Sequence, residues 1–252
     1  MTAADGSFDY VLGLADDALV LGHRLSEWCG HAPFLEEELA LANIGLDLIG
    51  TARRLYDHAG AIEGRGRDQD ALAYLRDAPD YRNLLLVEQP NGDFAATMVR
   101  QLLYSAYAAP FWRAMRESRD ATLAAIAADA APEAAYHLRH ASEWLVRLGD
   151  GTAESQRRTQ QALDALWPYG GELFEAGDSL ARLIGAGIAA DPAALRPAWE
   201  AQVGAVLAEA RLRRPADGWM QSGGRRGRHS EHLGYLLAEL QFLQRAYPGA
   251  QW

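Results

Sequence analysis

The hydrophobic side chains in the first part of the chain recur at alternating steps of three and four positions. One stripe runs Val11, Leu14, Ala18, Leu21, Leu25 and Trp28, and a second runs Leu35, Leu39, Ala42, Leu46, Ile49 and Tyr56. Because such steps place side chains on one face of an α-helix, each stripe predicts an amphipathic helix. Gly30 and Pro33 separate the two helices, since both residue types interrupt a helix.

Two further long helices are predicted in the middle of the chain. The first begins near Asp93, a suitable N-cap, and Pro110 is expected to kink it. The second begins at about residue 120, continues to Leu148 and is rich in alanine, which lets neighbouring backbones approach closely. Shorter helices are predicted over about 153–167, 172–185, 192–213 and 230–246.

Residues 60–92 form a long polar connection between the second and third long helices, with a short helix predicted around 69–76. A connection of this length can cross from one end of a bundle to the other. No stretch alternates in the manner of a β-strand. The pattern therefore predicts an all-α fold, a ferritin-like four-helix bundle with a long crossover and extra C-terminal helices. We expect one domain over 1–252, with a core bundle at about 9–148 and a C-terminal helical region at about 152–248.

Composition narrows the class of protein. The 252 residues are 49% hydrophobic and 23% charged, an ordinary globular balance, and the net charge of −10 argues against nucleic-acid binding. The single cysteine, Cys29, fits a reducing compartment. The first ten residues lack the features of a signal peptide, and no apolar run reaches the length of a membrane span. We expect a soluble cytoplasmic protein without a membrane partner.

A ferritin-like bundle raises the question of a di-metal site. Such a site needs one Glu from each of two helices and a Glu-x-x-His pair from each of the other two. Glu133 and His137 come closest, but they are four residues apart, and the residue three before His137 is Ala134. The acidic run at 36–38 has only apolar residues three positions further on. The residues indicate the architecture of a di-metal protein without its ligand set.

We therefore expect His137 to be buried and hydrogen-bonded, with no metal beside it. Glu37, Asp47, Glu133 and His137 would form a buried polar remnant at the position of the metal site. The alternative is that these four residues are atypical ligands, which would make the chain a di-metal oxygenase in its own right. The residues alone leave both possibilities open.

The concentrated basic stretch of this acidic chain is Gly223–Arg228, with the sequence GGRRGR. Guanidinium groups and backbone amides there could hold a phosphate, although the Lys-Ser/Thr of a P-loop is missing. The alternative is a solvated or partner-contacting loop. For His229 and His232 we favour a helix-capping role over metal binding. We interpret His23 and Glu27 as an ordinary polar pair rather than as metal ligands.

Long segments of unusual composition occur in order along nearly the whole chain. They include LSEWCGHAP at 25–33, LANIGLD at 41–47, NLLLVEQPNG at 83–92, LGDGT at 148–152 and AWE at 198–200. These segments resemble the structural subunits of bacterial phenylacetyl-CoA epoxidases. The resemblance rests on several long blocks rather than on composition.

The resemblance implies a subunit with no cofactor of its own, paired with a homologous catalytic subunit. In the family, that partner carries a di-iron site and oxidises the aromatic ring of phenylacetyl-CoA to an epoxide. The pair assembles further, and a reductase subunit interacts with this chain only indirectly. A stand-alone ferritin-like binding protein is a third alternative.

Two sets of residues are candidates for contacts of this subunit. We expect the partner to bind most of phenylacetyl-CoA, with the phosphates of CoA met by Arg76, Asn83, Arg225 and Arg226. Aromatic residues are enriched at interfaces, and the candidate anchors are Trp28, Phe111, Trp112 and the stretch Trp167–Tyr169. Ordinary core packing is the equal alternative for these aromatic side chains.

Overall fold

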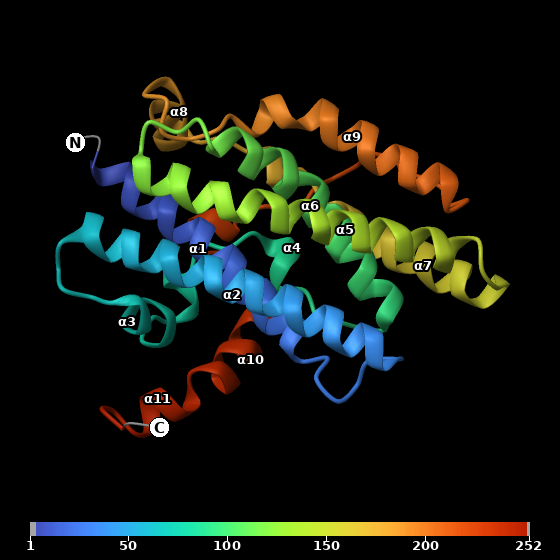
Figure 1. Ribbon diagram of the computed structural model, residues 1–252, viewed down its shortest axis with the longest axis horizontal. Coiled ribbons are helices and arrows are strands. Elements are labelled where there is room, and N and C mark those ends of the chain that lie inside the picture. The colour runs from blue at the N-terminus through green and yellow to red at the C-terminus, as the bar shows by residue number, and fades with distance from the viewer. Residues whose placement is uncertain (1–3, 251–252) are drawn as a thin grey trace.

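The computed structural model describes residues 4–250, and within them it contains helices and loops without a β-strand. Four long helices form the bundle: α1 (Ala4–Ser26), α2 (Leu35–Glu63), α5 (Phe94–Met115) and α6 (Ala121–Gly149). They pack as two hairpins, α1 with α2 and α5 with α6 (Figure 1). The prediction of an all-α, ferritin-like bundle is confirmed.

The starts of α5 and α6 follow from their caps. The Asp93 carboxylate accepts the N–H of Ala96 at 3.0 Å. The Asp120 carboxylate accepts the N–H groups of Thr122 and Leu123. A carboxylate at the N-cap satisfies free N–H groups and complements the helix dipole. Both starts lie where the sequence predicts them.

Helix α2 is longer than its sequence pattern predicts. The glycines after His58 predict an end there, but the helix continues through Gly60 to Glu63. Gly60 instead lets the backbone of Arg67 approach the helix closely, because a Cβ atom at this position would lie 2.3 Å from the carbonyl oxygen of Arg67. The helix ends at Gly64, whose φ of 67° is left-handed and whose N–H bonds the carbonyl of Gly60.

The rotation of α2 about its axis also differs from the prediction. The side chains of Leu35, Leu39 and Leu46, part of the second stripe, are 71%, 58% and 66% exposed. The buried face consists of other apolar residues, among them Leu41, Ile44, Leu48 and Leu55. A close contact with α1 explains the difference, since a Cβ on Gly22 would lie 3.2 Å from the carbonyl oxygen of Gly45. These glycines fix which face of α2 turns toward α1.

Helices α1 and α5 lie at the centre of the molecule. Every residue from 11 to 22 in α1 and from 97 to 109 in α5 is buried. Helix α1 contacts α2, α4 and α8, and α5 contacts α6, α7 and α9, so each is covered on several sides. Both are therefore apolar around most of their circumference, as buried helices are.

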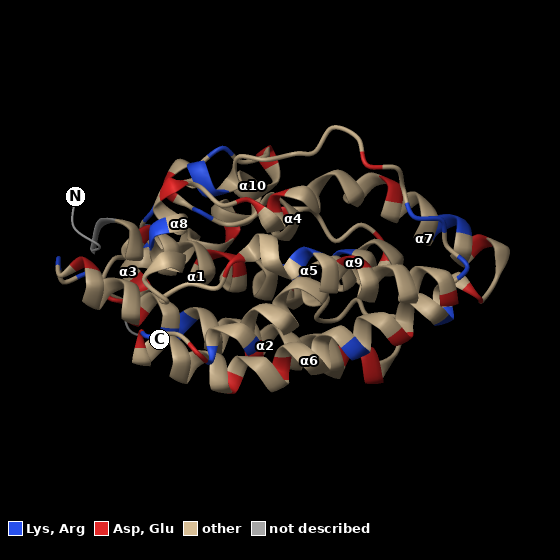
Figure 2. Ribbon diagram, turned by 90° about the horizontal axis from the view of Figure 1, so that it is seen from above, with Lys and Arg blue, Asp and Glu red and all other residues tan. Residues whose placement is uncertain are grey.

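The crossover and the C-terminal region supply the remaining elements. They are α3 (Gln69–Tyr74), η1 (Ala78–Asp80), α4 (Leu85–Glu88), α7 (Ala153–Leu166), η2 (Trp167–Tyr169), η3 (Gly171–Phe174), α8 (Asp178–Gly185), α9 (Pro192–Glu209), η4 (Gly224–Arg226), α10 (Glu231–Leu240) and α11 (Phe242–Ala246). The helix predicted over 172–185 begins only at Asp178, and the one predicted over 230–246 is divided at Gln241. Figure 2 shows α2 and α6 side by side, with α4 and α10 on the opposite side of the bundle.

Within residues 4–250, no helix has both the length and the hydropathy that a membrane crossing requires.

The aromatic residues proposed as interface anchors belong mainly to the core. Phe111, Trp112 and Trp167 are buried. The Trp28 side chain is half-buried, packs edge-on against Phe94 and donates its indole N–H to Thr97 at 3.1 Å. Tyr169 is half-buried against the core as well. Core packing, the alternative considered for these residues, is the one that the structure supports.

A buried ion pair joins α1 to the crossover. Asp16, which is 0% exposed, accepts hydrogen bonds from the Arg76 guanidinium, the Tyr56 hydroxyl at 2.6 Å and the Arg82 backbone N–H at 2.7 Å. Burial alone would lower the pKa of Arg76, but Asp16 raises it above its usual range. The pair is therefore ionised in the interior.

Three more buried carboxylates bind the crossover and the loop at 223–230 to the same region. They are Asp17 on α1, Glu88 on α4 and Glu172 on η3. Each accepts hydrogen bonds of 2.6–2.8 Å from both segments, so that residues far apart in the sequence share one acceptor. Such networks stabilise an arrangement because every buried charge has its partners.

Replacing Asp16 by alanine is expected to destabilise the protein by about 3–5 kcal/mol, because Arg76 is left as an unpaired buried charge. Urea unfolding followed by circular dichroism measures the change. Arg157→Ala is the matched control, since Arg157 pairs with Glu154 on the exposed surface of α7, and its unfolding midpoint should stay at the wild-type value. Equal midpoints for both variants would contradict the importance given to the buried pair.

Candidate functional site

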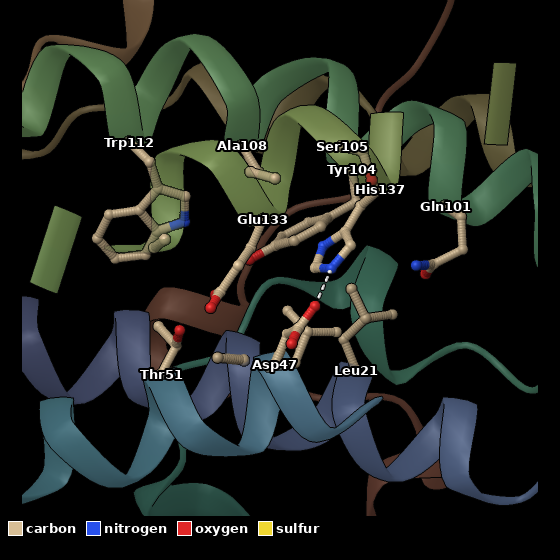
Figure 3. A pocket seen from close by; sticks show the side chains of 14 residues that line it. Leu21, Asp47, Thr51, Gln101, Tyr104, Ser105, Ala108, Trp112, Glu133 and His137 are labelled. Carbon is tan, nitrogen blue, oxygen red and sulfur yellow. Dashed lines mark hydrogen bonds and ion pairs between the residues drawn. The ribbon is translucent and has the colours of Figure 1, made fainter. Parts of the chain in front are cut away.

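The centre of the bundle holds a small cavity of about 20 Å³, to which all four long helices contribute (Figure 3). Its polar lining consists of Asp47, Thr51, Gln101, Tyr104, Ser105, Glu133 and His137. A cavity of this size is about as large as one water molecule. A ferritin-like bundle carries its metal ions between these four helices, so this lining is the place to examine the predicted polar remnant.

His137 is buried in the wall of the cavity and bonded to the opposite helix. Its Nε2 lies 3.0 Å from Oδ2 of Asp47 (Figure 3). Because a carboxylate accepts and does not donate, we assign the proton to Nε2. Burial lowers the pKa of His137, although Asp47 acts in the opposite direction. The imidazole is therefore neutral at pH 7.

Glu133 extends into the cavity from α6, one turn before His137 (Figure 3). Burial raises its pKa to about 7, and the neighbouring Asp47 and Asp129 carboxylates add to the effect, while Arg54 opposes it. Among the described residues, Glu133 has neither a hydrogen-bond donor nor an ion-pair partner for its side chain. It is a half-buried carboxyl group whose charged form only the more distant Arg54 stabilises among the described residues.

Glu37, the fourth residue of the predicted remnant, lies outside the cavity. Its Oε2 is 2.8 Å from Nε2 of His140, a residue that was not predicted from the sequence. The signal was present, because His140 follows His137 by three positions and so shares its helix face. His58 and Asp120 form a third pair at 2.8 Å. Three histidine–carboxylate pairs thus join α2 to α6.

This arrangement does not fit a di-metal centre. Among the described residues, no group of three or more His, Cys, Asp or Glu side chains is placed to hold a metal ion. Two ions of a carboxylate site lie about 3.5–4 Å apart, whereas the cavity has room for one water-sized atom. His137 and Asp47 also bond each other rather than a common third atom.

The residues expected to meet the phosphates of CoA divide into buried and exposed ones. Arg76 and Asn83 are only 4% and 0% exposed, so in this structure neither presents its side chain at the surface. Arg225 turns inward, where its guanidinium lies 2.6 Å from Asp17. Arg226 remains on the surface, 3.7 Å from Glu175. The sequence could not separate these arginines because their acidic partners lie far away along the chain.

The two loops that contain these residues nevertheless lie next to each other. A Cβ atom on Gly227 would lie 2.2 Å from the carbonyl oxygen of Pro79. Between the loops is an open hollow of about 420 Å³, lined by residues 78–79, 227–231 and 234. A second hollow of about 510 Å³ continues from it along α10 and α11. Together they form a surface groove with Arg228 at one end.

His229 has both ring nitrogens occupied. Nδ1 lies 2.8 Å from Glu88 and Nε2 lies 3.0 Å from the carbonyl oxygen of Tyr81. Burial alone would lower its pKa, but the hydrogen bonds to Glu88 and Tyr81 raise it above the usual value. We therefore assign an imidazolium that fastens the C-terminal loop. The helix-capping role considered for His229 is not the one seen, because its ring bonds the crossover instead.

His137→Gln is expected to remove one contribution to stability that rises with pH. The folded-state pKa of His137 is below its unfolded value of about 6.5, so the unfolded chain binds the extra proton first as the pH falls. The contribution is present above about pH 6.5 and is lost as the pH falls. Urea unfolding at several pH values measures the slope.

Glu133→Gln provides the opposite control for that measurement. The folded-state pKa of Glu133 is raised, so its ionisation costs stability as the pH increases from about 4.5 to 7. Replacing it should stabilise the protein at pH 8 by about 1 kcal/mol, a value reduced for the partial exposure of the side chain. Equal slopes for the two variants would contradict both assignments.

Comparison with known proteins gives matches over nearly the whole chain. The sequence model of the family described as "Phenylacetic acid catabolic protein" matches residues 2–252. One of the subunits of the 1,2-phenylacetyl-CoA epoxidase of Escherichia coli (strain K12) is 52% identical over 243 residues, which cover 96% of this chain and 98% of the relative. The chain therefore belongs to the phenylacetic acid catabolic protein family.

Proposed function

We propose that this chain is the non-catalytic structural subunit of a multicomponent di-iron phenylacetyl-CoA epoxidase that acts in aerobic phenylacetate degradation. Its role is to scaffold a homologous catalytic subunit that carries the di-iron site. The observation that carries the proposal is the pairing at the bundle centre, where His137 and Asp47 bond each other and leave no ligand set for two metal ions among the described residues.

The relative supports the assignment to a complex. Its name describes one subunit of an epoxidase, so at least one further chain completes that enzyme. The identity of 52% extends over the whole bundle and the C-terminal helices. On this proposal, electrons reach the catalytic partner from a reductase that interacts with this chain only indirectly, and the complex works in the cytoplasm.

The alternative of an oxygenase with atypical ligands finds less support in the geometry. It requires Glu37, Asp47, Glu133 and His137 to approach one metal cluster. Glu37 instead bonds His140, outside the cavity that the other three line. A stand-alone binding protein would need a site of its own, and the bundle centre offers about 20 Å³.

The surface groove beside η1 is the place where this chain would touch the CoA moiety. Arg228 lines the groove, Arg226 is exposed two residues before it, and guanidinium groups bind phosphates well. The two hollows continue from Arg228 along an apolar floor formed by Ala78, Leu237 and Ala238. Most of phenylacetyl-CoA stays on a catalytic subunit of the further assembled complex, and the groove would receive only the phosphate-bearing end.

The first test of the proposed function is metal content. The complex purified after coexpression of this chain with the catalytic subunit should contain the full di-iron complement, and this chain alone should contain none. His137→Gln should leave the iron content and the epoxidation rate of the complex at wild-type values, because His137 holds no metal. Iron in this chain alone at about two ions per molecule, lost in His137→Gln, would establish the oxygenase alternative instead.

The second test concerns the CoA contact. The double substitution Arg226→Glu and Arg228→Glu should raise the KM of the complex for phenylacetyl-CoA several-fold and leave kcat unchanged, because only binding of the phosphates is affected. Arg182→Glu on the exposed side of α8 is the control and should leave both constants unchanged. Arg225 is kept intact, since its loss would leave the buried Asp17 without its ion-pair partner. An unchanged KM in the double variant would remove this groove from the substrate site.

A further inference from the structure

Helix α2 presents two apolar faces, of which the bundle covers only one. The covered face packs against α1 and α6. The other face carries the exposed leucines 35, 39 and 46 together with the exposed Ala42, at steps of four, three and four. These steps make one continuous stripe along the helix. A helix that is apolar on opposite faces is typical of a buried element, so the outer stripe has the character of a surface that a further chain covers.

Helix α6 continues the same surface with small residues. Its outward side carries Ala121, Ala125, Ala128, Pro132 and Ala135, all exposed. Tyr136, at 40% exposure, lies beside this row and contacts the His140 ring. Small side chains allow another helix to approach closely. We call the outward surface of α2 and α6, with the two stripes described above, the α2–α6 face.

The centre of the α2–α6 face is acidic. Glu133 opens onto it between the two helices, half-buried and without a partner among the described residues, and Asp47 is partly exposed beside it. The nearby Asp129 is already paired with Arg54. A carboxyl group without a direct partner is costly to cover in its charged form, and a cationic side chain on the covering chain offsets that cost. The face therefore favours a partner with a cationic side chain opposite Glu133.

The same charge argues against other occupants. A symmetric contact between two copies of this chain places the same acidic patch on both sides, so the carboxyl groups of the two copies come close to one another near the two-fold axis. An anionic lipid surface would be repelled by these carboxylates and by the net charge of −10. The cavity beneath this face measures about 20 Å³, which is too small for an organic ligand.

We infer that the α2–α6 face is the docking surface for the catalytic subunit, and that this subunit places an arginine or lysine side chain against Glu133. The inference rests on the proposed function, because it takes the catalytic subunit as the partner. It adds which face is covered, and it names Glu133 as the residue that recognises the partner by charge. Leu39 and Leu46 supply the apolar contacts around that ion pair.

Binding of the purified catalytic subunit to variants of this chain tests the inference. Leu39→Glu and Leu46→Glu should each weaken the affinity by about 30-fold or more, as loss of a central apolar contact does. Glu133→Lys should weaken it at least as strongly, and Glu133→Gln by about tenfold with a smaller dependence on salt. All of these side chains are at least partly exposed in the isolated chain, so thermal unfolding should show intact folds.

Matched controls lie outside the α2–α6 face and outside the groove. Tyr235→Glu and Trp219→Glu change exposed aromatic residues on α10 and in the loop before η4, and Glu209→Gln removes an exposed carboxylate from α9. All three should bind the catalytic subunit with wild-type affinity. They distinguish an effect of changing the α2–α6 face on affinity from a general effect of adding or removing a charge.

The outcomes distinguish the inference from the proposed function. If the wild-type chain fails to bind the catalytic subunit, the proposed function is wrong. If it binds, and the leucine variants retain wild-type affinity while Tyr235→Glu or Trp219→Glu loses it, the docking face is wrong and the function stands. If the leucine variants lose affinity but both Glu133 variants keep it, the cationic contact is wrong.

Discussion

Two adjacent buried carboxylates on α1, Asp16 and Asp17, hold the molecule together beyond its four-helix core. Each binds an arginine side chain, and the two arginines come from the crossover and from the C-terminal loop. An unpaired charge in the interior is expensive, so neither segment can leave α1 without stranding a buried carboxylate. The C-terminal loop and α10 are thereby fastened to the bundle, and Arg76 and Arg225 serve the fold rather than a ligand.

The interface between α2 and α6 keeps polar residues inside the bundle, although no group of three or more of the described His, Cys, Asp or Glu side chains is placed to hold a metal ion. Histidines and carboxylates remain between the helices, but they satisfy one another in pairs across the interface. A neutral, hydrogen-bonded imidazole at His137 costs little when it is buried. Glu133 is the exception, because its pairing residue is not found among the described residues. This exception connects the interior to the surface that we assign to the partner.

Membership of the phenylacetic acid catabolic protein family agrees with a chain that works in a complex. The outer side of α2 carries its own apolar stripe, and α6 beside it exposes small residues. Exposure of apolar side chains to water is unfavourable, and association with a partner removes this apolar area from solvent. The relative's description as a subunit agrees with the partner that we propose for this surface.

The sequence by itself determined the four long helices, their caps and the long crossover, because helical periodicity and capping depend on neighbours within a few residues. It also revealed that Glu-x-x-His pairs are missing. Only the tertiary structure decided which face of α2 is buried, since the contact between Gly22 and Gly45 sets its rotation. It likewise decided that Arg76 is interior, because its partner Asp16 is 60 positions away. The local sequence pattern shows which faces of a helix are apolar enough to be buried, and contacts between residues far apart in the sequence determine which of these faces is buried.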